Sequence, residues 1–250
     1  MNTHIFYTAG HSDALNYAIQ IMAQKGCIFT DTPDASVTDL ILPIPSFDAN
    51  GDLRGGGDIF QILAQLPDNI TIYGGNLSSL SDKYQTVDLL QDPFYLAENA
   101  DITAHCAIKL AMAKLPVTLK NCPVLIIGWG RIGKCLARLL WNMDALVTVA
   151  ARKENDRAML AALGYDTQDT TFSSRCDLPK YRVIFNTVPE MILPRNLPCQ
   201  KDCLKIDLAS VNGMEGNDVI IARGLPSKDA PESSGELIAR TILYKKGAFA

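Results

Sequence analysis

The stretch 124-VLIIGWGRIGKCLARLL-140 decides how the second half of the chain folds. It opens with four apolar residues, Val124–Ile127, which are typical of a short buried strand. Glycines then follow in the spacing Gly-x-Gly-x-x-Gly, and the residues after them are apolar at a helical period. A strand, a glycine turn and a helix in this order predict a turn that binds the phosphates of a dinucleotide.

Each glycine of this turn has its own expected role. Gly128 permits the tight turn, Gly130 lets the backbone approach a pyrophosphate, and Gly133 lets the helix pack closely on the strand. The start of the helix then offers free N–H groups and the positive end of its dipole. The alternative is a glycine-rich turn without a ligand. The residues expected to contact the cofactor here are Gly128, Trp129, Gly130, Arg131, Ile132 and Gly133.

The end of the following strand, 147–150, distinguishes between the two nicotinamide cofactors. NAD sites usually place an acidic residue there, which accepts a hydrogen bond from the ribose 2′-hydroxyl. This chain has Ala151, Arg152 and Lys153 instead. Cations suit a 2′-phosphate, so NADP is favoured over NAD. The alternative is a solvated Arg-Lys pair, which explains the cations but not the missing acid.

Apolar runs of strand length alternate with helical patterns along almost the whole chain, which predicts an α/β fold with parallel sheets. A second unit is expected to begin near Leu119. The expected strands are 5–7, 27–29, 40–42, 70–73, 124–127, 147–150, 183–185, 204–208 and 219–222. The expected helices are one from about Asp13, then 59–66, 101–114 and 236–245, with others between the strands of the second unit.

Two further strand ends carry polar residues. Ligands of a doubly wound sheet lie beyond the carboxyl ends of its strands, so both ends are candidates for the nicotinamide side of the site. Asn186 and Ser210 are expected to hydrogen-bond ribose or substrate, and ordinary turn chemistry is the alternative. The residues expected to line this side are Asn186, Thr187, Val188, Pro189, Ala209 and Ser210.

The composition restricts the possible partners. The 250 residues are 48% hydrophobic and carry a net charge of −4, with no basic block and no apolar run of membrane-spanning length. Nucleic acid and membranes are therefore poor partners. Seven cysteines stand without a Cys-x-x-Cys pair, which favours free thiols in a reducing cytoplasm over disulfides or a metal site.

The motifs together resemble the family of dipicolinate synthase A subunits. The stretches that carry this resemblance are "DLILPIPSFDANG", "ITIYGGN", "GWGRIGKCLARLL", "NTVPEMIL", "DLAS" and "ARGLPSKDAPESSGELIA", and they run in order over most of the chain. The glycine motif alone is shared with many dehydrogenases, including the D-2-hydroxyacid dehydrogenases. The absence of an arginine after Asn186 and of a later Glu/His pair argues against that reaction.

The resemblance implies two doubly wound parallel-sheet domains. Residues 1–100 would form a flavodoxin-like substrate domain, joined by the C-terminal helix 231–250; 101–116 would be a linking helix and 117–230 a Rossmann NAD(P)-binding domain. The implied activity is pyridine-nucleotide-dependent formation of pyridine-2,6-dicarboxylate from a dihydro- or tetrahydrodipicolinate precursor of the lysine pathway, and with the cations after 147–150 the expected enzyme is an NADP-dependent oxidoreductase. A small dicarboxylate is the implied substrate, a flavoprotein-like B subunit the implied partner, and sporulation the setting. A homo-oligomer is expected.

The chain departs from the family pattern at its best catalytic candidate. Where the family reads Thr-x-Glu-Gly, this chain reads Thr103-Ala-His105-Cys106, and the segment after Ser210 is short. His105 is the expected acid–base residue, at the start of the linking helix, because an imidazole titrates near neutral pH; a structural histidine is the alternative. These departures also leave open a regulatory module that binds NAD(P) without catalysis.

Two residues of the first half are weaker candidates. Arg54, in a glycine-rich loop, could clamp a substrate carboxylate, and His11 follows a strand end at Gly10. A solvated loop arginine explains the first equally well.

Overall fold

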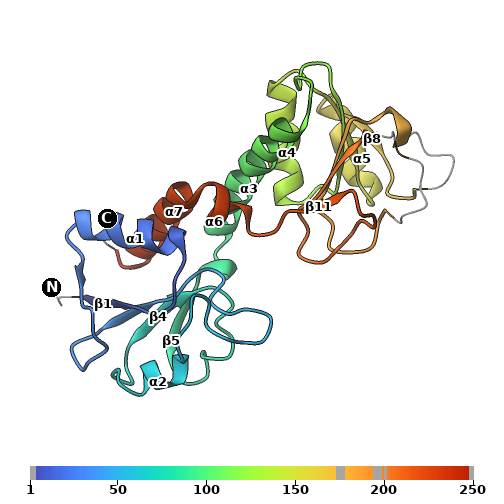
Figure 1. The fold of residues 1–250 in the computed structure, drawn as a ribbon. Helices are drawn as coiled ribbons and strands as arrows, with labels where there is room; N and C mark the ends of the chain where they lie inside the picture. Colours follow the sequence, from blue (N-terminus) through green and yellow to red (C-terminus); the bar gives the residue numbers. More distant parts are fainter. Residues whose placement is uncertain (1–3, 173–177, 194–198, 200–201, 248–250) are drawn as a thin grey trace. The chain divides into compact units, whose positions relative to one another are not determined.

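The computed structural model describes residues 4–172, 178–193, 199 and 202–247. They divide into two compact units (Figure 1). One unit runs to Asn99 and resumes at Pro226, and the other spans Ala100–Leu225. Each unit has its own parallel sheet, so the predicted α/β class with two parallel-sheet domains is confirmed.

Five parallel strands form the sheet of the first unit within the described residues, in the order β2-β1-β3-β4-β5. Their bounds are β1 Ile5–Thr8, β2 Ile28–Phe29, β3 Asp39–Ile41, β4 Thr71–Gly74 and β5 Gln85–Asp88. This order is that of flavodoxin-like sheets. The pattern analysis missed β5, because the strand has a single apolar residue, Val87, and lies at the edge of the sheet.

Helices cover both faces of this sheet. The covering helices are α1 Asp13–Gln24, α2 Ile59–Leu63 and α7 Pro231–Lys245, with a 3₁₀ turn η1 at Leu89–Gln91; the short helix α6, Leu225–Asp229, precedes α7. In Figure 1, α1 and α7 lie side by side over one face, and α2 lies on the other. A Cβ added at Gly235 of α7 would lie 2.5 Å from the Cβ of Tyr17. The helix expected to return to the first unit therefore packs directly on α1. Residues 248–250 of that predicted segment lie outside the described residues.

Helix α3 (Pro93–Lys114) begins well before residue 101, where the sequence predicted its start. Its first turn is capped by Asp92, whose Oδ1 accepts the N–H groups of Phe94 and Tyr95, both at 2.9 Å. Proline fits the first helical position because its missing N–H is not needed there. The Asp-Pro pair is thus the start signal, and His105 lies in the middle of the helix.

Asp92 also pairs with Lys245 of α7, and this predicts a pH-dependent contribution to stability. The Lys245 ammonium, together with the N–H groups of Tyr95 and Phe94, lowers the pKa of the nearly buried Asp92 carboxyl. A lowered pKa means that the contribution is present above the unfolded aspartate pKa of about 3.9 and is lost as the pH falls through the folded value. Asp92→Ala should lower the free energy of unfolding by about 1–2 kcal/mol at pH 7.

Urea unfolding at pH 7 and in acid would measure this contribution. The gap between wild type and Asp92→Ala should shrink as the pH falls below about 4. The matched control is Asp31→Ala, because Asp31 is exposed; its loss should stay below about 0.5 kcal/mol. A gap that does not change with pH would contradict the lowered pKa and show that the contribution of Asp92 does not depend on its charge.

Six parallel strands form the sheet of the second unit, counting those in the described residues, in the order β8-β7-β6-β9-β10-β11. Their bounds are β6 Pro123–Ile127, β7 Leu146–Ala150, β8 Asp166–Gln168, β9 Val183–Asn186, β10 Leu204–Asp207 and β11 Val219–Ile221. This is the strand order of a Rossmann domain. The chain adds strands outward from β6 on one side and then, starting with β9, on the other side, so the strand order reverses between β6 and β9. Ligands of such sheets bind at that reversal.

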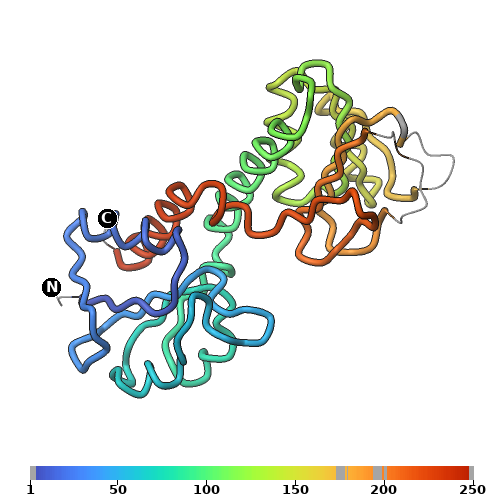
Figure 2. The backbone as a smooth tube through the Cα atoms, in the orientation of Figure 1, coloured from blue at the N-terminus to red at the C-terminus, as the bar shows by residue number. Residues whose placement is uncertain are grey.

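The two halves of this sheet are covered differently. The first half carries α4 (Arg131–Asn142) and α5 (Glu154–Ala162), and a 3₁₀ turn η2 (Leu178–Lys180) precedes β9. Residues 187–193 and 208–218, which follow β9 and β10, contain no helix (Figure 2). Leu193 and Met214 from these loops instead pair as an isolated bridge and join the buried cluster on that face. None of the helices in the described ranges is long and apolar enough to cross a membrane.

Candidate functional site

The glycines of the turn after β6 differ in what surrounds them. Gly128 has a φ of +105°, and a Cβ added there would lie 2.4 Å from Thr187 Oγ1. A Cβ on Gly133 would lie 2.2 Å from the Gly128 carbonyl oxygen, so α4 packs directly on the turn. A Cβ on Gly130 would meet no atom within 4 Å among the described residues. The first two positions therefore require glycine for internal packing, whereas the space beside Gly130 is open.

Helix α4 starts at this open position. Its N-cap is Gly130, which has no side chain that could cap the helix. The first N–H groups of a helix, here those of Arg131, Ile132 and Gly133, have no partner inside the helix. Together with the helix dipole they attract an anion. The turn therefore has the features of a phosphate-binding helix N-terminus.

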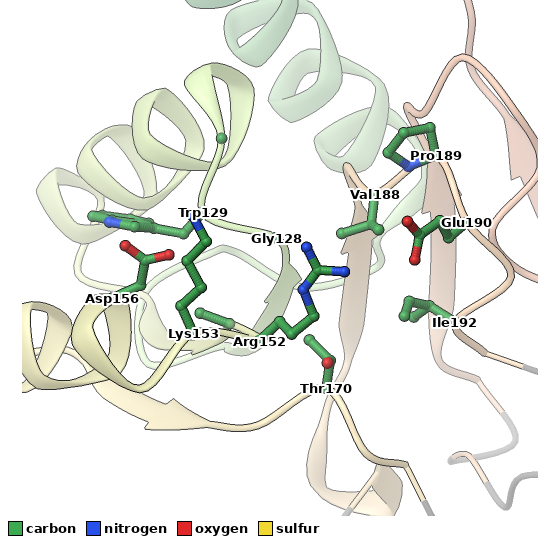
Figure 3. Close-up of a pocket in the computed structure, with 12 residues that line it drawn as sticks. Gly128, Trp129, Arg152, Lys153, Asp156, Thr170, Val188, Pro189, Glu190 and Ile192 are labelled. Carbon is green, nitrogen blue, oxygen red and sulfur yellow. The ribbon is translucent and has the colours of Figure 1, made fainter.

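A pocket of about 320 Å³ lies beside this turn (Figure 3). It lies at the reversal point of the sheet, where Gly128 follows β6 and Val188 follows β9. The lining residues that the sequence predicted are Gly128, Trp129, Gly130, Ala151, Arg152, Lys153, Val188 and Pro189. Its position and these residues agree with a dinucleotide site.

The other predicted cofactor residues are not part of this lining. Thr187 is turned inward, since its hydroxyl donates to the Ile127 carbonyl at 2.9 Å. Ala209 is buried behind the strand end, and Ser210 is exposed on the bend that follows. Arg131, Ile132, Gly133, Asn186, Thr187, Ala209 and Ser210 are thus absent from the lining as the described residues define it.

Charged groups of both signs face the pocket. Arg152 and Lys153 follow shortly after β7, line the pocket and are exposed. The pocket also contains a carboxylate, Asp156, from the first turn of α5. In Figure 3, Asp156 lies on the side of Trp129 and Lys153, and the Arg152 side chain extends on the side of Gly128 and Val188. The acidic residue typical of an NAD site is therefore missing at the end of β7, but the pocket does contain a carboxylate.

The structure places the side chain of Asn186 inside the protein. Its side chain is fully buried, and Nδ2 donates to Asp207 Oδ1 at 2.9 Å and to the Val188 carbonyl at 3.0 Å. Its Oδ1 accepts the Val188 N–H at 3.0 Å. The amide that we expected to contact ribose or substrate is occupied within the protein, because it joins two neighbouring strand ends. Asn186 thus lies behind the pocket lining and holds Val188, which is part of it.

His105 is also placed differently from the sequence prediction. It lies in mid-helix on α3, with a side chain that is 62% exposed and with Nε2 3.7 Å from Asp101 Oδ2. Asp101 already accepts a hydrogen bond from Arg138 Nη2 at 2.9 Å. His105 does not line the pocket that the described residues form around Gly128. Its predicted place at a helix start is wrong, because the helix begins at Pro93.

His105→Ala is therefore expected to leave cofactor affinity unchanged within about two-fold and the free energy of unfolding within about 0.5 kcal/mol. An exposed imidazole at the edge of an existing ion pair contributes little. Titration with NADPH and urea unfolding would test this. A rise of the dissociation constant by ten-fold would instead place His105 in contact with the nucleotide.

Cys135 on α4 lies beside the same carboxylate. Burial, and after it the Asp101 carboxylate, raises the pKa of the Cys135 thiol. The thiol is therefore protonated at neutral pH and is a poor nucleophile.

The sequence reasoning missed four lining residues: Asp156, Thr170, Glu190 and Ile192. Thr170 follows β8, a strand of polar residues that the apolar pattern does not reveal. Glu190 and Ile192 lie in the "NTVPEMIL" stretch, whose position after a strand end was the available signal. Asp156 could have been found from its place in the first turn of a helix that follows the cations.

In the first unit, the structure brings the two weaker candidates together. The His11 N–H donates to the Arg54 carbonyl at 3.0 Å, and Arg54 Nε donates to the Phe47 carbonyl at 3.0 Å. Gly55 makes this contact possible, since a Cβ there would lie 2.0 Å from the His11 nitrogen. An exposed arginine side chain is thereby fixed next to the loop that follows β1.

The comparison with known sequences supports the resemblance. No family model matches the chain. The A subunit of dipicolinate synthase from Bacillus subtilis (strain 168) is 23% identical over 239 residues, which cover 86% of this chain and 80% of that protein. The predicted resemblance to dipicolinate synthase A subunits is thus confirmed.

Solved structures share the fold. The crystal structure of the dipicolinate synthase A subunit from Bacillus halodurans has a TM-score of 0.80 at 19% identity and covers 97% of both chains. The transhydrogenase from Sinorhizobium meliloti has a TM-score of 0.68 at 11% identity, covering 98% of this chain and 94% of that one. At these identities the likeness establishes the fold, with its two α/β domains.

Proposed function

We propose that the chain is a pyridine-nucleotide-dependent oxidoreductase that binds its cofactor at the Gly128–Gly133 turn. The observation that carries this proposal is the open space beside Gly130, at the uncapped N-terminus of α4 and at the reversal point of a Rossmann sheet. A pyrophosphate fits there because the N–H groups can bind it and no side chain fills the space. The bound cofactor would supply hydride transfer at its nicotinamide ring.

We further propose that the cofactor is NADP. Arg152 and Lys153 follow the strand whose end meets the adenosine ribose in this fold. A guanidinium can bind a 2′-phosphate through two parallel hydrogen bonds. Arg152 is the main selectivity residue of the proposal, because its guanidinium extends into the pocket, whereas the carboxylates of Asp156 and Glu190 also face it.

The proposed substrate is a small cyclic dicarboxylate, and the proposed product is pyridine-2,6-dicarboxylate. The similarity to the A subunit of dipicolinate synthase supports this choice. Arg54 is our candidate for binding a substrate carboxylate, because its guanidinium is held by Phe47 and stays exposed. On the same basis we propose a cytoplasmic enzyme of sporulating cells that works with a flavoprotein-like B subunit, and as a homo-oligomer.

One observation favours a second function, an NAD(P)-binding module without catalysis. Of the three predicted catalytic residues, Asn186 uses its side-chain amide in hydrogen bonds within the protein. Neither His105 nor Ser210 lines the pocket in the described structure. The nucleotide site would then serve to sense the cofactor. The pocket supports both functions equally.

The test separates binding from turnover. Trp129 lines the pocket, so energy transfer from its indole to a bound reduced nicotinamide reports binding; a Trp141→Phe background removes the other tryptophan signal. We expect tighter binding of NADPH than of NADH, and NADP-dependent product formation from dihydrodipicolinate with or without a B subunit. Binding without turnover in either assay would favour the sensing module. Failure to bind either nucleotide would contradict both functions.

A further inference from the structure

Arg157 makes an unusual pair of contacts behind the cations of the pocket. It lies in the second turn of α5 and is half-buried. Its Nη1 donates to the carbonyl oxygens of both Ala151 and Arg152, each at 2.8 Å. One side-chain nitrogen therefore holds two successive peptide groups of the turn that follows β7.

Of the two carbonyls, that of Ala151 depends most on Arg157. Ala151 is 2% exposed, and a buried carbonyl without a hydrogen-bond donor is unfavourable. The Ala151 N–H is already fixed by the Gln168 carbonyl of β8 at 3.0 Å. With Arg157 in place, the backbone is held on both sides of Ala151 and through the Arg152 carbonyl. A guanidinium suits this role because it stays charged at any pH and its donors are rigid.

The held turn determines where the Arg152 side chain leaves the backbone. Arg152 lines the pocket and extends on the Gly128 side of it (Figure 3). Arg157 is not among the residues that line the pocket in the described structure. Its side-chain contacts are thus with the backbone, and its effect on a ligand passes through the Ala151–Arg152 turn, in which Arg152 is the charged residue.

We propose that Arg157 is a positioning residue that sets cofactor selectivity, by fixing the Ala151–Arg152 turn so that Arg152 meets the 2′-phosphate of NADP. This inference rests on the proposed function. NADH has no 2′-phosphate, so its binding does not use Arg152 and should be insensitive to the turn. Selectivity for nucleotides with a 2′-phosphate is therefore the property that Arg157 controls.

The test compares Arg157→Met, which keeps the apolar stem and removes the donors, with wild type. The dissociation constant for NADPH should rise roughly ten-fold, the effect of losing about one hydrogen bond to a charged group, and that for NADH less than about two-fold. The matched control is Arg138→Met, another arginine of this unit, which contacts Asp101 and should change neither constant. If Arg157→Met does not fold, Arg157→Gln keeps one N–H₂ donor group and should show about a three-fold effect on NADPH alone.

A double-mutant cycle with Arg152→Ala shows whether Arg157 acts through Arg152. We expect Arg157→Met to have almost no further effect on NADPH binding in the Arg152→Ala background. Additive effects, or an equal loss of NADPH and NADH affinity in the single variant, would overturn the inference. If wild type prefers NADPH and Arg157→Met keeps this preference, the inference about Arg157 is overturned but the NADP proposal stands. Wild type without any preference for NADPH would overturn the NADP proposal as well.

Discussion

Asp207→Ala is expected to lose about 3–5 kcal/mol of the free energy of unfolding. Asp207 is 1% exposed, and its carboxylate accepts four hydrogen bonds. The donors are Asn186 Nδ2 at 2.9 Å and the N–H groups of Ala209, Gly213 and Met214 at 3.1, 2.7 and 3.2 Å. Each buried donor left without a partner costs about 1–3 kcal/mol. Urea unfolding followed by circular dichroism would measure the loss.

The same substitution should also weaken cofactor binding, because the carboxylate supports two parts of the pocket wall. Through Asn186 it holds Val188, and through Gly213 it holds Ile192, whose N–H donates to the Gly213 carbonyl at 2.8 Å. Gly213 cannot carry a side chain here, since a Cβ would lie 2.3 Å from Asn186 Nδ2. We expect the folded variant to bind NADPH at least about ten-fold more weakly.

The matched control is Asp218→Ala, in the same unit. Asp218 is an exposed carboxylate that pairs at 2.8 Å with Lys205, whose side chain is 13% exposed, and we expect its removal to cost about 1 kcal/mol, well below the loss for Asp207. An equal loss of stability in both variants would contradict the assigned role of Asp207. Asp207→Asn is a milder test, because it keeps the shape of the side chain and one acceptor oxygen. Its N–H₂ group then faces N–H donors, so part of the stability should still be lost.

The nucleotide turn could be predicted from the sequence because its parts are consecutive in the chain. Strand, glycines and helix lie within 124–140, and each step depends on local geometry, as the φ of Gly128 and the close packing of Gly133 show. The two cations are likewise adjacent to a strand that the apolar pattern reveals. The backbone turn and Arg152 are thus the parts of the pocket that could be predicted from residues adjacent in the sequence.

The network around Asp207 could not be predicted in this way. Asp207 and Asn186 meet because β9 and β10 are aligned with these two residues opposite one another. Sequence reasoning placed both at strand ends but treated Asn186 as a ligand contact, since strand register is set by packing of whole sheets. The contact of Arg157 with the Ala151 and Arg152 carbonyls could not be predicted either, because it depends on how α5 is oriented. His105 was misplaced for a simpler reason, the overlooked Asp-Pro start signal of α3.

Arg152→Asp is expected to reverse the cofactor preference. The NADPH dissociation constant should rise roughly 100-fold or more, because a charge-assisted contact is replaced by repulsion between a carboxylate and the 2′-phosphate. The NADH constant should stay within about three-fold or improve, since a carboxylate at this strand end can accept the 2′-hydroxyl of the adenosine ribose. Titrations at one fixed ionic strength would measure both constants.

The control for Arg152→Asp must make the same change of charge elsewhere in the unit. Lys120→Asp does so, since Lys120 is exposed and lines a separate hollow with Met112 and Val117. If long-range charge alone determines affinity, Lys120→Asp would weaken NADPH as Arg152→Asp does. If Arg152 binds the phosphate directly, Lys120→Asp leaves the NADPH-to-NADH ratio unchanged and only Arg152→Asp inverts it. An unchanged ratio in Arg152→Asp would assign the 2′-phosphate, and with it NADP selectivity, to other residues or to none.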